Sequence, residues 1–255
     1  MINNFNLQNK KDTSALLEIN DLIKKSLFIY KKNLFNILKF SLWGHIFYIS
    51  GPDLIEIYGR PIVKLIGFNI WSTIIIYLLV FLLILIMYLY LSTYRIATIL
   101  ISKSNSNKID FNEMLRMAHK RSLPYMFLSL LLIAINLGGF LLFVFPLAIL
   151  STWFYFAPYI LIDQNTSILQ AINISKKYVK SAFFSIFARI WTLPILNALV
   201  LFFFRQQHQP IFTVTSWLFQ ILYNPLILIY SFVLYKNVKQ FFENNIEKEK
   251  VINSF

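Results

Sequence analysis

The chain alternates between long apolar runs and shorter polar segments, and this alternation predicts membrane-spanning helices. A span needs about 20 mostly apolar residues, because the hydrocarbon core is about 30 Å thick and each helical residue rises about 1.5 Å. Five stretches reach or approach this length, and the third is long enough for two spans. They are Leu34 to Ser50, Phe68 to Thr93, Leu123 to Ile162, Ala182 to Phe204 and Ile211 to Tyr235. We therefore expect an all-α integral membrane protein with six transmembrane helices.

Two of these stretches carry particular features. Leu34 to Ser50 is the weakest candidate, because it is short and contains Lys39 and His45. Whether it crosses the membrane fully stays open from the sequence. Leu123 to Ile162 has no charged residue, and Pro146 near its middle predicts a tight turn between two antiparallel helices. No segment alternates apolar and polar residues in the way that a membrane β-barrel requires.

The distribution of Lys and Arg predicts the orientation, since cytoplasmic loops of membrane proteins carry an excess of these residues. Of the 24 basic residues, 20 lie in four segments: the N-terminal part up to Lys39, Arg95 to Arg121, Lys176 to Lys180, and the tail from Lys236. Six spans with both termini in the cytoplasm place all four segments on one side. We expect a cytoplasmic segment over residues 1–33, a six-span membrane domain over 34–235 and a cytoplasmic tail over 236–255. The N-terminal segment is charged and has no uninterrupted apolar core, so we expect no cleavable signal peptide. The expected location is a bacterial inner membrane.

Three of the basic segments have the periodicity of amphipathic helices that run into a span. The first follows an apolar stripe from Leu16 to Leu34, the second starts at Asp110, and the third starts near Thr166. We expect all three to lie in the cytoplasmic interface, apolar face toward lipid and basic residues toward anionic headgroups. The expected headgroup contacts are Lys24, Lys25, Lys31, Lys32, Arg116, Lys120, Arg121, Lys176, Lys177 and Lys180. The alternative, that these are short connectors whose charges only fix the topology, stays open.

Composition excludes several functional classes. The net charge is +13, but the basic residues lie between apolar runs instead of forming one continuous stripe, so we expect membrane lipids and no nucleic acid as partners. The chain has no Cys, which rules out disulfides, thiolate catalysis and Cys-ligated metals. The three His fall in different parts of the predicted topology, and no HExxH, GxSxG or P-loop motif is present. We expect no catalytic residues, no cofactor and no metal, and hence no enzyme.

A few ionisable residues still need a role. Asp53, Glu56 and His208 share the predicted outer face, where a small metal site is conceivable, although loop carboxylates are usually only solvated. No Asp or Glu lies in the middle of a predicted span, so the spans offer no carboxylate that could relay a proton. Arg189 lies inside a span, and we expect it to form a structural ion pair with Asp163.

The second half of the chain carries motifs of a known family. These are Phe145-Pro146, FAPYILIDQ (Phe156 to Gln164), ILQAINISKKYVK (Ile168 to Lys180) and LILIYSFVLYKNVKQF (Leu226 to Phe241). They resemble the YciC-like family of uncharacterised bacterial inner-membrane proteins, and more loosely the membrane domain joined to some glycerophosphodiester phosphodiesterases. The resemblance implies a multi-pass inner-membrane protein of unestablished activity. A phosphodiesterase domain would need well over a hundred further residues, so its activity is not implied.

Two functional hypotheses follow. The first is a non-enzymatic protein whose basic amphipathic helices organise lipid or a membrane partner. The second is a transporter of a small or lipid-like molecule, working through spans kinked near Pro158, Pro194 and Pro225. A lipid-sized cavity between the spans would favour the transporter, and a solidly packed bundle with flat cytoplasmic helices would favour the first hypothesis.

Overall fold

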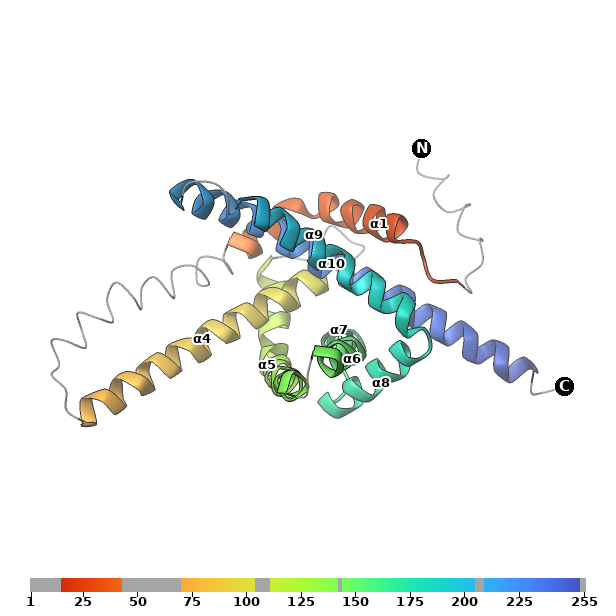
Figure 1. Cartoon of the computed structure of the whole chain (residues 1–255), viewed down its shortest axis with the longest axis horizontal. Coiled ribbons are helices and arrows are strands. Elements are labelled where there is room, and N and C mark those ends of the chain that lie inside the picture. The colour runs from red at the N-terminus through yellow and green to blue at the C-terminus, as the bar shows by residue number, and fades with distance from the viewer. Residues whose placement is uncertain (1–14, 43–69, 104–110, 142–143, 205–208, 253–255) are drawn as a thin grey trace.

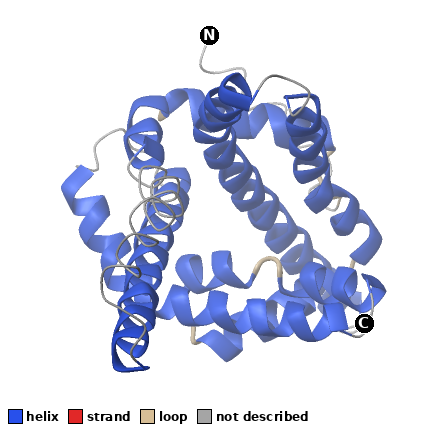
Figure 2. Cartoon of the chain, turned by 60° about the vertical axis from the view of Figure 1, so that its left-hand side comes forward, coloured by secondary structure: helices blue, strands red, loops and turns tan. Residues whose placement is uncertain are grey.

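The computed structural model describes residues 15–42, 70–103, 111–141, 144–204 and 209–252. Within these ranges every regular element is an α-helix, as Figure 2 shows and as the sequence predicts. The helices in chain order are α1 (Ile19–Lys32), α4 (Ile70–Lys103), α5 (Phe111–Leu141), α6 (Val144–Phe154), α7 (Ala157–Gln164), α8 (Ile168–Lys180), α9 (Phe183–Phe204) and α10 (Gln209–Ile252). Residues 34–42 are also helical. In Figure 1 the short helix α7 lies near the centre of the molecule.

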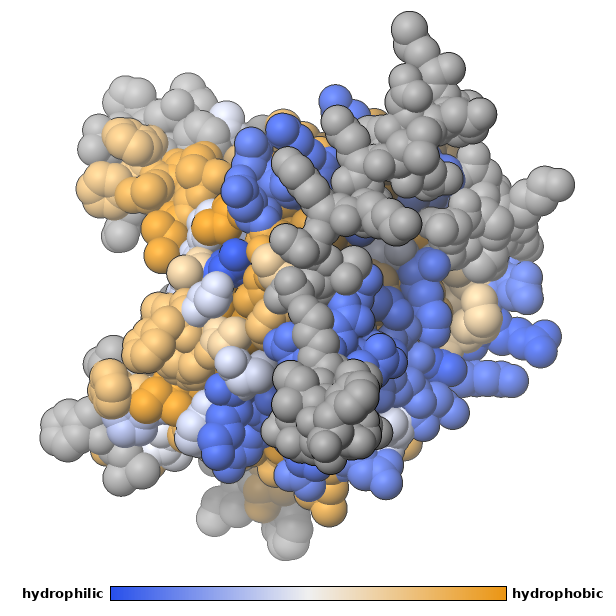
Figure 3. Space-filling view, turned by 90° about the vertical axis from the view of Figure 1, so that its right-hand side faces the viewer, coloured by the Kyte–Doolittle hydropathy of each residue, from blue (hydrophilic) through white to orange (hydrophobic). Residues whose placement is uncertain are grey.

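Five helical stretches in the described residues are long and apolar enough to cross a membrane. They are Leu85–Lys103, Asn112–Leu141, Phe145–Gln164, Phe183–Phe203 and Leu218–Glu247. Only 17% of the α9 stretch and 28% of the α5 stretch are buried inside the protein. Apolar surface of this extent needs lipid or a partner to cover it, and in the view of Figure 3 it gathers on the left, with hydrophilic residues at the centre and right. These helices indicate a membrane protein. Of the remaining predicted span, Leu34 to Ser50, the structure describes only residues 34–42, so a full crossing of the membrane stays a prediction.

The predicted hairpin between Leu123 and Ile162 is present, with its turn a few residues earlier than expected. Helix α5 ends at Leu141 and α6 begins at Val144, and the two helices pack against each other. Pro146 lies inside the first turn of α6 instead of in the turn between the helices. A proline is tolerated there because the first helical N–H groups have no partner within the helix.

Three helices continue past the boundaries that the charges suggest, and one of them is α10, which runs on from Tyr235 to Ile252. The second span was expected to end at Thr93, but α4 runs on to Lys103 and takes Arg95 into the helix. Likewise α5 is continuous from Phe111 to Leu141, so the second amphipathic segment is the first part of a spanning helix and not a separate in-plane helix. The expectation of three interfacial helices is wrong for this segment. The charged residues are good helix formers, and the helix passes through Pro124 without a break.

The spanning stretch Phe145–Gln164 is interrupted between α6 and α7, and α8 supplies hydrogen-bond partners for the backbone groups at this break. The hydroxyl of Ser175 in α8 accepts a hydrogen bond from the Phe156 N–H (3.2 Å) and donates one to the Trp153 carbonyl (2.7 Å). Backbone groups freed by a broken spanning helix need such partners, because lipid offers none. The Tyr155 hydroxyl at the same level lies 2.7 Å from the Ser231 hydroxyl of α10.

Helix α8 forms where the third amphipathic segment is predicted. A capping box starts it, in which Ser167 and Gln170 bond each other's backbone N–H groups. Asn165, just before it, closes α7 in the left-handed conformation with φ of 54°. The buried face of α8, including Ala171, packs on α6 and α7. This face of α8 therefore packs on protein and not on lipid, and an in-plane position of α8 at the membrane interface stays a prediction.

Helix α1 lies lengthwise along α10. The Leu17 N–H donates to the Asn237 side-chain oxygen (3.0 Å), and the Tyr30 hydroxyl donates to the Leu222 carbonyl (3.1 Å). The two helices therefore run antiparallel over residues 222–237, instead of α1 packing its apolar stripe on lipid alone. The described lysines of α1 are exposed, so this outer face belongs in headgroups or water and not in hydrocarbon.

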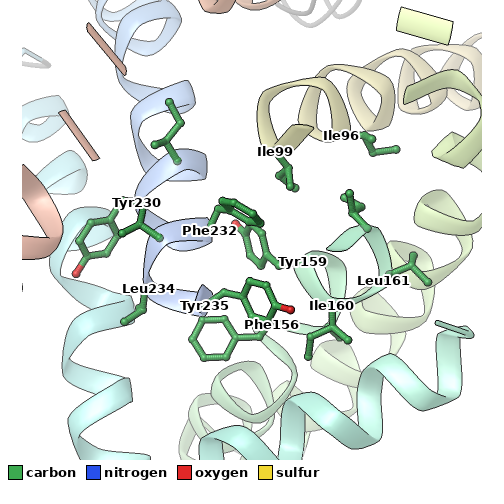
Figure 4. Close-up of a cluster of buried hydrophobic side chains, with 14 of the residues drawn as sticks. Ile96, Ile99, Phe156, Tyr159, Ile160, Leu161, Tyr230, Phe232, Leu234 and Tyr235 are labelled. Atoms are coloured by element: carbon green, nitrogen blue, oxygen red, sulfur yellow. The ribbon is translucent and has the colours of Figure 1, made fainter. Parts of the chain in front are cut away.

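The core is an aromatic layer between α7 and α10, with aliphatic residues of α4 beside it (Figure 4). The Tyr159 and Tyr235 rings stack with centroids 6.3 Å apart, and Phe232 lies 5.9 Å from Tyr235 and 6.4 Å from Tyr159. Phe156 packs on Tyr235 at 6.2 Å. Most of α7 is buried, so this eight-residue helix is the element around which α4, α5, α8 and α10 are arranged.

Candidate functional site

A groove lies between the helical residues 34–42, α4 and the first turns of α5. Its volume is about 460 Å³, which is within the range of about 300 to 1,000 Å³ that small-molecule pockets have. We call it the lipid groove, and it is lined by Phe40, Ile86, Leu89, Tyr90, Thr93, Tyr94, Leu115, Arg116 and His119. Most of these side chains are apolar, and the two basic ones both come from α5. The groove thus combines an apolar wall with a basic end.

The helical repeat explains why these residues share one wall. In α4, the residues from Ile86 to Tyr94 that line the groove recur at spacings of three and four, which places them on one face of the helix. In α5, His119 lies one turn after Leu115 and Arg116. The sequence predicts that Arg116 and His119 oppose the apolar face of this segment. In the structure both side chains are exposed, and both border the groove.

The other predicted basic residues of α5 have different surroundings. Lys120 is exposed and is not among the groove residues. Arg121 is partly buried, and its guanidinium donates a very short hydrogen bond to the Ile162 carbonyl near the end of α7. A cation at a helix C-terminus stabilises the exposed carbonyl groups there. Arg121 therefore has a structural role in addition to any headgroup contact.

The remaining predicted headgroup lysines lie on the surface. Lys24, Lys25, Lys31 and Lys32 of α1 are exposed, as are Lys176, Lys177 and Lys180 of α8. The Lys176 ammonium lies over the Trp153 ring, 4.8 Å from its centroid. Contact with headgroups stays a prediction for all seven.

Asp163 is the centre of a polar cluster that joins three helices. Its side chain is only 4% exposed. The Lys236 ammonium of α10 lies 2.8 Å from each carboxylate oxygen, and the Tyr235 hydroxyl donates at 2.9 Å. Lys103 of α4 lies 3.1 Å away, and Lys239 lies 3.8 Å away. One carboxylate thus joins the end of α4 and the middle of α10 to the end of α7.

The predicted ion pair between Asp163 and Arg189 is therefore wrong. The Arg189 guanidinium donates to the Leu17 carbonyl at 3.0 Å and to the Ser185 carbonyl at 2.8 Å, and it also bonds the Ser185 hydroxyl. It joins α9 to the residues before α1. Both residues are structural, as expected, but each has partners that lie far from it in the sequence.

Gln164 continues the same cluster toward α8. Its side-chain amide donates to the Tyr178 hydroxyl at 3.3 Å and to the Tyr235 hydroxyl at 3.1 Å. Burial raises the pKa of Tyr178, so this hydroxyl stays protonated at neutral pH and serves as an acceptor. The polar end of α7 is thereby fixed to α4, α5, α8 and α10.

Sequence reasoning missed four basic residues: Arg95, Lys103, Lys236 and Lys239. It placed Arg95 at the start of a loop, although the seven residues after it are uncharged, which was a signal that the helix continues. The three lysines were counted only as topology signals. Their convergence on Asp163 depends on contacts between residues 60 and 76 positions apart, which no local pattern reveals.

The described part of the chain contains no group of three His, Asp or Glu residues placed to hold a metal ion. Asp53, Glu56 and His208, which form the candidate metal site on the outer face, lie outside the described residues. No protein-family model matches this chain, and neither a curated protein nor a solved structure shows significant similarity to it. The geometry of the site must therefore support the functional proposal by itself.

Proposed function

We propose that this chain is a non-enzymatic, multi-span protein of a bacterial inner membrane, with both termini in the cytoplasm, that holds an anionic lipid. The lipid groove is the observation that supports this proposal. An apolar wall of about 460 Å³ with Arg116 and His119 at its border matches an amphiphile that has an anionic head and an apolar tail.

The chemistry of each end of the groove fits this ligand. The Arg116 guanidinium is permanently charged and binds phosphate oxygens through two parallel N–H groups. The His119 imidazole supplies a further hydrogen-bond donor beside it. Ile86, Leu89 and Leu115 offer an apolar surface to an acyl chain. The exposed lysines of α8 add attraction to an anionic leaflet, at about 1 kcal/mol for each residue near the surface.

The test compares charge-matched variants on one helix. Arg116→Gln removes a groove residue, and Lys120→Gln removes an exposed charge four residues later that does not line the groove. Each protein is purified from membranes of phosphatidylcholine and phosphatidylglycerol, and the retained lipid is counted by mass spectrometry. We expect Arg116→Gln to retain less than half of the phosphatidylglycerol that the parent retains, and Lys120→Gln to retain nearly all of it. Equal retention by the parent and both variants would remove the support for a lipid site in the groove.

The competing function is a transporter of a small or lipid-like molecule. The groove favours it as well, because transport requires a cavity of this kind between helices. The two functions differ in one measurable property, the movement of a fluorescent lipid between the leaflets of proteoliposomes. Holding a lipid predicts no movement above protein-free vesicles. Movement that Arg116→Gln abolishes would favour the transporter.

A further inference from the structure

Arg95 is a charged residue inside a membrane-spanning stretch. It lies in α4, eight residues before Lys103 and so about 12 Å along the helix from the Asp163 cluster. Its guanidinium is partly buried among tyrosines of three helices, Tyr88, Tyr125 and Tyr159. A charge at such a position is costly in a membrane, and it usually marks a functional site.

The described residues around Arg95 provide no compensating negative charge. Across the ranges that the structure describes, no carboxylate lies within ion-pair distance of Arg95, and its neighbours are neutral hydroxyl groups. Arg189, which also lies in a described spanning stretch, makes a useful comparison. Its donors are taken up by the Leu17 and Ser185 carbonyls. Arg95 forms a side-chain hydrogen bond with the neutral Tyr125 hydroxyl. A structural role therefore accounts for Arg189, whereas Arg95 has no negatively charged partner among the described residues.

Beside Arg95 lies a cavity of about 250 Å³, which we call the arginine cavity. Its polar lining comes from four helices and comprises Arg95, Tyr125, Asn136, Ser151, Tyr155 and Tyr159. The side-chain oxygen of Asn136 is buried and has no hydrogen-bond partner among the residues that the structure describes. A buried polar atom without a partner costs about 1 to 3 kcal/mol, so a bound molecule at this position would stabilise the protein. Rotating the amide by 180° offers a donor in the same place.

We propose that the arginine cavity binds one oxyanion, the carboxylate or phosphate group of a small molecule or of a lipid headgroup. The Arg95 guanidinium pairs with two oxygen atoms of this group, and the Tyr125 hydroxyl and the Asn136 amide complete its hydrogen bonds. The low dielectric constant of the site strengthens this pairing. A volume of about 250 Å³ fits an anionic group with a short apolar body and excludes a whole acyl chain.

This site is distinct from the lipid groove. Tyr94 lines the groove and Arg95 lines the arginine cavity, and successive helical residues point about 100° apart. The two sites therefore lie on different faces of α4 and share no residue. A variant of one site leaves the other site intact, so the two proposals can fail independently.

The test is calorimetric titration of the whole protein in phosphatidylcholine nanodiscs. The titrants are sodium benzoate and inorganic phosphate as free anions, and dihexanoyl phosphatidic acid as a lipid headgroup. We expect at least one titrant to bind the parent, to bind Arg95→Gln at least tenfold more weakly, and to bind Arg189→Gln and Lys120→Gln, whose side chain lines neither cavity, within twofold of the parent. Binding of benzoate or phosphate identifies a free anion, and binding of the phosphatidic acid alone identifies a headgroup.

Thermal unfolding separates a ligand site from a structural arginine. Arg95→Gln without anion should melt at or above the temperature of the parent, because the substitution removes an uncompensated charge. Adding the bound anion should raise the melting temperature of the parent and of Arg95→Lys, but not that of Arg95→Gln. The proposal is overturned if no titrant binds the parent, if Arg189→Gln weakens binding as much as Arg95→Gln, or if the anion stabilises Arg95→Gln equally.

Discussion

The Asp163 carboxylate, at the end of α7, contacts the end of α4 and the middle of α10. The substitution Asp163→Asn keeps the shape of the side chain but removes the charge that faces Lys103, Lys236 and Lys239. Hydrogen bonds to charged groups contribute about 1.5 to 3 kcal/mol each, so we expect the variant to melt several degrees below the parent in detergent. Circular dichroism during heating measures this change.

The control for this prediction is Glu243→Gln. Glu243 is 56% exposed and lies 3.9 Å from Lys239 on the same helix. Exposed pairs of this kind contribute about 0.3 to 0.5 kcal/mol, so its melting temperature should stay within about 2 °C of the parent. Equal melting of Asp163→Asn and the parent would show that the cluster does not hold these helices together.

At the scale of residues, the sequence predicted what kind of role a charged residue has better than it predicted which residue it contacts. It assigned Asp163 and Arg189 to structural ion pairing near a helix end, and both do form structural contacts. The pairing itself was wrong, because partner choice depends on how helices rotate and approach each other. Local periodicity contains no information on these two variables. Arg95 was missed for a related reason, since a charge alone does not end a helix.

Ser175 connects α8 to the break between α6 and α7. Ser175→Ala leaves the Phe156 N–H and the Trp153 carbonyl without partners in a buried position. Each buried group that loses its partner costs about 1 to 3 kcal/mol. We expect a melting temperature several degrees below the parent and faster hydrogen exchange at residues 153–157, measured by mass spectrometry.

Ser181→Ala is the matched control on the same helix. Ser181 is exposed, and its hydroxyl bonds the Tyr178 carbonyl one turn earlier. Its loss should change stability by no more than about 0.5 kcal/mol. If Ser175→Ala and Ser181→Ala have the same melting temperature and hydrogen exchange, the hydrogen bonds from Ser175 do not stabilise the break between α6 and α7.

At the scale of elements, the apolar runs predicted where the spanning helices lie, but helix ends predicted from the polar residues were wrong. The hairpin after Leu123, helix α8 and its length follow from local patterns of charge, capping and apolar spacing. The continuous helices α4, α5 and α10 do not, because Lys, Arg and Glu are good helix formers and extend a helix beyond the membrane. The break at Phe156 also escaped prediction, since it depends on a hydroxyl group 19 residues later.

At the scale of the whole molecule, the proposed topology relates the two sites to the membrane. The lipid groove has its basic residues near the start of α5, and the exposed lysines of α8 follow the end of α7. If both regions face the cytoplasm, they meet the anionic leaflet together, and the basic residues act on headgroups from one side. The turn between α5 and α6 then faces the opposite side. The orientation is therefore the central claim of the account.

Single-cysteine labelling tests this orientation directly, because the chain contains no native Cys. Phe145→Cys places a thiol at the start of α6, where the native side chain is 75% exposed, and Gln170→Cys places one on the exposed face of α8. An impermeant maleimide is added to intact spheroplasts, and permeabilised cells serve as the control for reactivity. The account predicts that Cys at 145 is labelled in both preparations and that Cys at 170 is labelled only after permeabilisation. Labelling at 170 in intact spheroplasts, with protection at 145, would contradict the orientation and the lipid-binding function that depends on it.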